Sequence, residues 1–205
     1  MQIVVTADDR QWEELTGLCD NIEWVRVSEP SLFGDYKEAF AFFNLNNDAA
    51  TSGYNEVKGP VFINAVTTTL KEVNATDQIV RINGWPGFLL RPVWEIAGKL
   101  DENIHLISIQ LNKKFIPVAD EPGLIAARVI AMIINEAYFA LEDKVSTKAE
   151  IDTAMKLGTN YPYGPFEWAA IIGIKNIFEL LRQLSSTDKR YLPSALLILE
   201  AHNNN

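Results

Sequence analysis

The sequence predicts two domains: an α/β domain with a mostly parallel sheet over residues 1–119, and an all-helical domain over residues 120–205. Short apolar runs bounded by Gly, Pro and Asn recur through the first half, as in the buried strands of an α/β sheet. After residue 120 only helical periodicity remains. With 205 residues, 48% of them hydrophobic, the chain is long enough for two small domains with real cores.

The first half opens with a β-branched run at Gln2–Thr6, a helical segment at Asp9–Leu18 and a second strand at Glu23–Val27. Because parallel strands need a crossover connection, this β-α-β start favours a Rossmann-like sheet, here in a shortened form. A further helix is predicted at Asp101–Leu111. The remaining predicted strands are Phe40–Leu45, Val61–Ala65, Ile79–Ile82 and Phe115–Val118.

The helical half begins with Leu124–Leu141, which is apolar almost all round and is therefore expected in a core or a subunit interface. A capping box formed by Thr147 and Glu150 opens the next helix, and Gly158 is expected to supply its left-handed C-cap. Pro165 is expected to start a third helix, since the first turn does not need its missing amide. The last helices are predicted at Ile177–Leu184 and Pro193–Ala201.

Charge and composition exclude several function classes. The net charge is -9, so the chain lacks the long basic face that nucleic-acid binding needs. Cys19 is the only cysteine and the two histidines, His105 and His202, lie far apart, so no metal site is expected. The apolar stretch Val129–Leu141 is too short to span a bilayer. Without a signal-peptide pattern, a cytoplasmic protein without membrane or nucleic-acid partners is expected.

Several blocks of the second half keep a specific spacing. They are Asp120–Ile125, Arg128, Asn135–Ala137, Asp152–Gly158 and Tyr161–Glu167. Together they resemble the C-terminal domain of the L-3-hydroxyacyl-CoA dehydrogenases, strongly over residues 120–184 and traceably over residues 60–98. The resemblance implies an NAD-binding Rossmann-like domain, a helical domain that usually forms a homodimer, and oxidation of 3-hydroxyacyl-CoA in fatty-acid β-oxidation. It also implies a catalytic His, a Glu that orients it, and Ser and Asn side chains that hold the reacting oxygen.

The turn after the first strand does not carry the nucleotide motif that the resemblance implies. A G-x-G-x-x-G pattern would fall on Ala7–Trp12, which contains no glycine. Asp8 and Asp9 stand where a diphosphate would lie, and as helix-capping acids they would repel an anion. Glu29, near the ribose-binding position, is more simply explained as a solvated turn acid. No cofactor is therefore expected, and NAD only if an altered site is active.

The catalytic positions of the family fall mostly on residues that cannot transfer a proton. The His position corresponds to Pro86 or Trp85, its Glu partner to Gly98 and the Asn to Ala127. Thr68 keeps a hydroxyl at the position that resembles the substrate-contacting Ser. No residue is therefore assigned a catalytic role, and Thr68 is the one retained hydroxyl candidate.

The resemblance further indicates a ligand cleft with residues from both halves. The candidates are Thr68, Trp85, Phe88, Arg128, Tyr161, Tyr163 and Glu167. Core packing is the more ordinary explanation of the aromatic residues, and an ion pair with Glu167 or Glu136 that of Arg128. Two hypotheses stay open. The chain is a homodimeric relative without NAD-dependent oxidation (a pseudoenzyme) that binds an acyl-CoA-like ligand or a protein partner, or it is an active dehydrogenase whose altered site uses Thr68.

Overall fold

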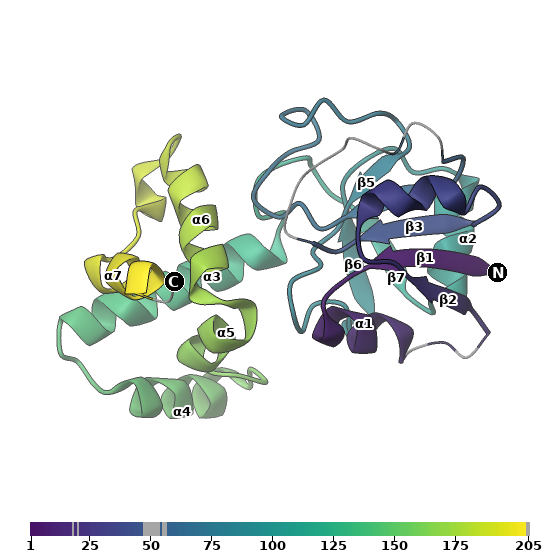
Figure 1. The fold of residues 1–205 in the computed structure, drawn as a ribbon. Helices are drawn as coiled ribbons and strands as arrows, with labels where there is room; N and C mark the ends of the chain where they lie inside the picture. The colour runs from purple at the N-terminus through teal and green to yellow at the C-terminus, as the bar shows by residue number, and fades with distance from the viewer. Residues whose placement is uncertain (18, 20, 47–53, 55–56, 204–205) are drawn as a thin grey trace. The chain divides into compact units, whose positions relative to one another are not determined.

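The structure is a computed structural model that describes residues 1–17, 19, 21–46, 54 and 57–203 (Figure 1). It divides into two compact units, Met1–Leu124 and Ile125–Asn205. The division falls close to residue 120, where the sequence pattern changes from short strands to helices. Each unit is described by itself below.

The first unit is built on a five-stranded parallel sheet with the strand order β2-β1-β3-β4-β5 (Figure 1). Its strands are β1 (Gln2–Thr6), β2 (Glu23–Arg26), β3 (Ala41–Asn44), β4 (Val61–Ile63) and β5 (Ile79–Arg81). From β1 the chain crosses to β2 on one side and then returns to β3 on the other. The predicted parallel, Rossmann-like sheet is therefore confirmed, and the order of its strands reverses between β1 and β3.

A second, two-stranded parallel sheet pairs β6 (Val93–Ile96) with β7 (Lys114–Pro117). The strand predicted at Phe115–Val118 is thus present, and it pairs outside the main sheet. Its partner β6 was not predicted, because four residues with two exposed or half-buried side chains give a weak strand pattern. Helix α2 (Glu102–Gln110) connects the two strands, and an isolated bridge from Ala97 to Arg81 joins this part to the end of β5.

Two apolar clusters cover the main sheet, one on each face, as a parallel sheet requires. Successive strand residues alternate between them, so that Phe43 belongs to one cluster and Phe42 to the other. Phe43 stacks on Phe62 with ring centroids 4.5 Å apart, and Phe42 packs against Phe33 at 5.1 Å. Phe33 lies in η1 (Pro30–Asp35), a short 3₁₀ helix that was not predicted.

The second unit contains only helices (Figure 1). They are α3 (Ala126–Glu142), α4 (Lys148–Thr159), α5 (Pro165–Ile172), α6 (Ile174–Ser185), η2 (Lys189–Tyr191) and α7 (Ala195–Asn203). Pro165 opens α5 as predicted. Helix α3 begins two residues later than predicted, because Leu124 has a φ of 49° and cannot belong to a right-handed helix. No helix in the described ranges is both long and apolar enough to cross a bilayer.

The prediction that Gly158 ends α4 is wrong. The helix continues to Thr159, and Asn160 takes the left-handed position with a φ of 56°. Asn tolerates this conformation better than most residues, and its N–H donates to the carbonyl of Lys156. The capping box at the start of α4 is present as predicted, with Thr147 and Glu150 each bonded to the other's backbone N–H.

Candidate functional site

The carboxyl ends of the strands are where open α/β sheets bind ligands, especially where the strand order reverses. In this chain the reversal lies between β1 and β3. The polar side chains that end or follow these strands are buried rather than open to solvent: Thr6 ends β1, Asn44 ends β3 and Asn64 follows β4. The edge therefore has the position of a ligand site, and its hydrogen bonds decide what it can accept.

Helix α1 (Asp9–Thr16) begins with a capping box formed by Asp8 and Gln11. The Gln11 N–H donates to the Asp8 carboxylate at 2.7 Å, and the Asp8 N–H donates to Gln11 Oε1 at 3.2 Å. Asp8 is thus the helix cap that the sequence predicted. The predicted end of this helix, Leu18, lies outside the described residues.

The Gln11 side chain also bridges the ends of two other strands. Its Nε2 donates to the carbonyl oxygens of Leu45 and Gly84, at 2.9 and 2.8 Å. Leu45 follows β3 and Gly84 follows β5, and Gln11 itself is only 4% exposed. One buried amide therefore joins the first turn of α1 to the backbone that follows β3 and β5.

Asn64 and Glu14 extend this network. Asn64 donates to the Leu45 carbonyl at 3.0 Å and accepts the Gly84 N–H at 2.9 Å. A Cβ on Gly84 would lie 2.9 Å from the Asn64 side chain, so this close approach requires glycine. Buried Glu14 on α1 accepts the Gly87 N–H with both carboxylate oxygens, at 2.8 Å each.

These residues do not fit the diphosphate of a dinucleotide in the arrangement that the family resemblance implies. Such a group binds free N–H donors at the start of the first helix, next to bare glycine backbone. Here the Asp8 carboxylate already accepts one of those donors and brings a negative charge. Gln11 in turn bonds to the backbone after β3 and after β5, next to the point where the strand order reverses.

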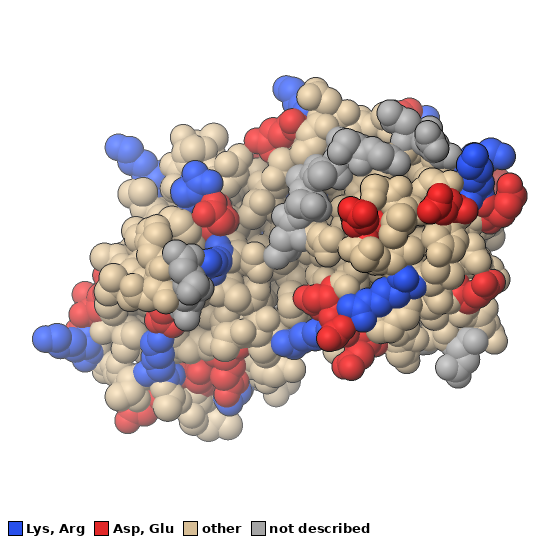
Figure 2. All heavy atoms as spheres, in the orientation of Figure 1, with Lys and Arg blue, Asp and Glu red and all other residues tan. Residues whose placement is uncertain are grey.

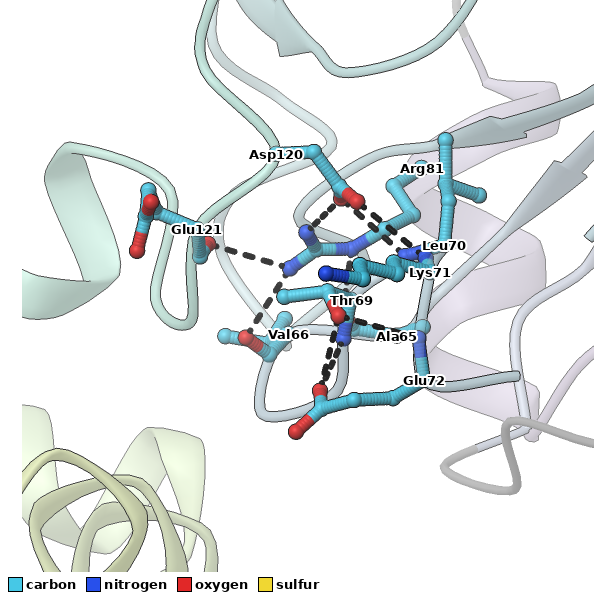
Figure 3. Close-up of polar contacts among 9 residues, drawn as sticks. All are labelled: Ala65, Val66, Thr69, Leu70, Lys71, Glu72, Arg81, Asp120 and Glu121. Atoms are coloured by element: carbon cyan, nitrogen blue, oxygen red, sulfur yellow. Dashed lines mark hydrogen bonds and ion pairs between the residues drawn. The ribbon is translucent and has the colours of Figure 1, made fainter. Parts of the chain in front are cut away.

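A second polar cluster surrounds Arg81 at the end of β5 (Figure 3). The guanidinium is fully buried and forms an ion pair with Asp120. It also donates to the carbonyl oxygens of Ala65 at 2.8 Å and of Val66 and Glu121 at 3.3 Å. Burial lowers the pKa of Arg81 and Asp120 opposes that shift, but a guanidinium stays charged at neutral pH. The cluster therefore satisfies one buried charge with a carboxylate and backbone oxygens.

The same cluster fixes the loop after β4, in which Thr68 lies. The Asp120 carboxylate accepts the N–H groups of Leu70 and Lys71, at 3.1 and 3.3 Å (Figure 3). Thr69 donates its N–H and hydroxyl to Glu72, at 2.7 and 2.9 Å, and these two bonds lower the Glu72 pKa. Thr68 itself is half-buried in this loop. Sequence reasoning missed Arg81, although a charged residue inside an apolar strand signals a buried partner.

The aromatic candidates of the first unit lie in its interior. Trp85 is 2% exposed and meets Phe88 edge to face, with ring centroids 6.3 Å apart. The Arg91 guanidinium lies 4.1 Å from the centroid of the Phe88 ring. Trp85 and Phe88 are both buried, as expected of aromatic residues that pack in a core.

The candidates of the second unit are more accessible. Tyr161 and Tyr163 are exposed, and Tyr163 meets Trp168 edge to face at 4.9 Å. Glu167 accepts from Lys156 Nζ at 2.5 Å and from the Gly164 N–H at 3.0 Å. These bonds, that of Lys156 first, lower the pKa of Glu167.

Glu167 forms an ion pair with Lys156. The pairing of Arg128 with Glu167 or Glu136, which the sequence suggested, stays a prediction. Arg128 is half-buried on α3, and Glu136 is exposed on the same helix. Among the described residues, no three His, Cys, Asp or Glu side chains are grouped as metal ligands. On the face drawn in Figure 2, the described acidic and basic side chains are interspersed.

Residues 123–200 match the family model of the 3-hydroxyacyl-CoA dehydrogenase C-terminal domain. Over 90 residues the chain is 47% identical to a 3-hydroxyadipyl-CoA dehydrogenase of Escherichia coli K12, which covers 43% of this chain and 19% of the relative. Over 141 residues it is 28% identical to a 3-hydroxybutyryl-CoA dehydrogenase of Clostridioides difficile, covering 65% of this chain and 50% of the relative. The chain thus spans half or less of the length of these curated relatives.

A solved structure shares the whole fold. FadB2 of M. tuberculosis aligns with 98% of this chain and 93% of its own, with a TM-score of 0.79 and 12% sequence identity. Fold and site together define a two-domain protein with a Rossmann-like α/β unit followed by an all-helical unit. Residues 123–200 are thus similar to the C-terminal domain of the 3-hydroxyacyl-CoA dehydrogenases, and the curated relatives that match this part of the chain carry such names. The resemblance noted in the sequence is thereby confirmed.

Proposed function

We propose that this chain is a protein of fatty-acid metabolism that does not itself oxidise 3-hydroxyacyl-CoA with NAD. The observation that carries this function is the Gln11 amide, which bridges the strand ends where a dinucleotide would lie. Loss of a general base alone lowers a rate by about 10²–10⁴-fold. Loss of the nucleotide site is more severe, because it removes the electron acceptor. Pro86 and Ala127, at two of the catalytic positions, support the same conclusion.

In this role the helical unit carries the function. It forms a homodimer, and the dimer binds an acyl-CoA-like ligand or a protein partner. Ile125, Val129 and Phe139 support the dimer, because all three are exposed and lie on one face of α3 and the residue before it. Exposed apolar faces of this kind are typically covered by another protein surface. In the proposed dimer, a second copy of the chain covers this face of α3 with its own α3 face, so that both partners contribute the same surface.

Titration with NADH should leave the melting temperature of the protein unchanged, and acetoacetyl-CoA with NADH should give no turnover. A ligand present at about 100 times its Kd would add about 2.7 kcal/mol to the unfolding free energy, a shift that a thermal melt resolves easily. An acetoacetyl-CoA shift without an NADH shift supports the ligand role. No shift with either supports the partner role.

The alternative is an active dehydrogenase with an altered site. Thr68 favours it, because its hydroxyl is retained in a loop that the Arg81 cluster fixes at the end of β4. Under this alternative NADH would raise the melting temperature and acetoacetyl-CoA would be reduced. Thr68→Val, which removes the hydroxyl at nearly constant volume, would then abolish turnover without abolishing the NADH shift. That pair of results would replace the function proposed above.

Light scattering of the full chain should give the mass of a dimer, and Val129→Asp should give a monomer. A charge placed at the centre of an apolar contact loses its hydration without gaining a partner. Val145→Asp is the matched control, since Val145 is exposed in the same unit but lies in the turn after α3. A monomeric wild-type chain, or equal effects of the two substitutions, would contradict a dimer through α3.

A further inference from the structure

A pocket of about 490 Å³ lies wholly within the helical unit. Residues from α3, α4, α5, α6 and α7 line it, and none of them belongs to the cleft candidates named from the family resemblance. Its volume falls within the range of about 300–1,000 Å³ that small-molecule sites occupy. We call it the helical-unit pocket.

Small side chains on one wall create the space. Ala169 and Ala170 of α5 and Gly173 after its end line the pocket. Gly173 has a φ of 93°, and a Cβ built there would meet only Asn176 Nδ2 within 4 Å, at 3.5 Å. Phe166 and Ile174 continue the apolar lining. One side of the pocket can therefore accept the hydrocarbon part of a ligand.

The lining also carries an ammonium group, that of Lys148, which has three neighbours. Lys148 Nζ lies 2.7 Å from Glu200 Oε2, and 5.3 and 5.2 Å from the ring centroids of Tyr138 and Phe166. The two rings meet edge to face at 5.0 Å, which fixes the surface beneath the ammonium. Because an ammonium group has three N–H donors and Glu200 uses one, Lys148 can also bind a ligand anion.

The charges of the lining favour a ligand with a single negative charge. Among the described residues that line the pocket, Lys148 and Lys175 are cationic and Glu200 is anionic. Burial, and secondarily Glu200, raise the pKa of Tyr138, so its hydroxyl stays neutral. The lining therefore carries a net charge of about one positive unit at neutral pH.

We propose that the helical-unit pocket binds a small monocarboxylate with an aliphatic chain. The chain lies on the wall formed by Phe166, Ala169 and Ala170, and the carboxylate pairs with Lys148 and Lys175. Apolar lining with a few placed polar groups is the usual composition of such sites. The carboxylate is held by charge-assisted hydrogen bonds, the stronger class of polar contact.

Isothermal titration of the full chain with octanoate tests this site, with octanol as the uncharged ligand of the same chain length. Octanoate should bind, and octanol should bind at least about tenfold more weakly, because a hydrogen bond to a charged group contributes about that factor or more. Lys175→Gln should weaken octanoate binding by about tenfold for the same reason. Ala170→Trp, at an exposed helix position, should fill the pocket and abolish binding.

Lys189→Gln is the matched control, because Lys189 is an exposed lysine of the same unit outside the pocket, and its loss changes the net charge equally. It should leave the octanoate affinity unchanged. Circular dichroism of each variant establishes that it is folded. Octanoate that does not bind at millimolar concentration, octanol that binds equally well, or equal weakening by Lys175→Gln and Lys189→Gln would each overturn the site. None of these outcomes affects the NADH and dimer tests above.

Discussion

Asp120→Ala should lower the free energy of unfolding by about 3–5 kcal/mol, the range typical of removing one partner from a buried ion pair. Arg81 is fully buried, and Asp120 is the carboxylate that balances its charge (Figure 3). The substitution would also leave the N–H groups of Leu70 and Lys71 without this acceptor. Urea denaturation of the full chain, followed by tryptophan fluorescence, measures the difference.

Two variants sharpen the result. Asp77→Ala removes the carboxylate of the exposed Lys99–Asp77 pair, at 3.0 Å, and should change stability by only about 0–1 kcal/mol. Arg81→Met combined with Asp120→Ala should recover part of the loss, because the uncompensated guanidinium is then gone. If Asp120→Ala were as mild as Asp77→Ala, the buried charge would not depend on this carboxylate.

Trp85→Ala should destabilise the first unit by about 3–5 kcal/mol, the usual cost of truncating a large aromatic residue in a core. Trp85 is among the largest fully buried side chains of the described residues, so its removal leaves a cavity. Trp12→Ala is the control with the same change of chemistry, since Trp12 is only half-buried on α1. It should cost less in the same urea titration.

The same variant distinguishes core packing from a ligand cleft. A residue that lines a cleft can be truncated with little loss of stability but with altered ligand binding. If the Trp85→Ala protein were as stable as wild type but bound acetoacetyl-CoA with a changed affinity, Trp85 would be a ligand-binding residue rather than a core residue. A large loss of stability agrees with the buried position of its ring.

Local signals in the sequence predicted much of the fold. The β-branched run at β1, Asp8 as a helix cap, the capping box at Thr147 and Pro165 at a helix start all depend on residues within one turn of each other. Such features are readable without tertiary structure. The change of hydrophobic period near residue 120, from short apolar runs to helical spacing, could also be recognised in the sequence alone.

The features that were missed depend on distant residues. Strand β6 is too short to be predicted from its hydrophobic pattern, and its pairing with β7 becomes apparent only in the folded chain. The sequence showed that the turn after β1 lacks glycine, but not that Gln11 reaches Leu45 and Gly84 across the strand ends. For the same reason Arg81 and Asp120, far apart in sequence, were not recognised as a pair.

The Gln11 bridge has a consequence for how the protein persists in a cell. In an enzyme whose nucleotide site has polar groups without partners in the protein, the bound nucleotide raises the free energy of unfolding. Such an enzyme is degraded more readily when the nucleotide is scarce. In the first unit of this chain, side-chain amides of the chain itself bond to the backbone at the corresponding strand ends. The function proposed above therefore predicts that the proteolytic lifetime of this protein does not change with the concentration of the nucleotide.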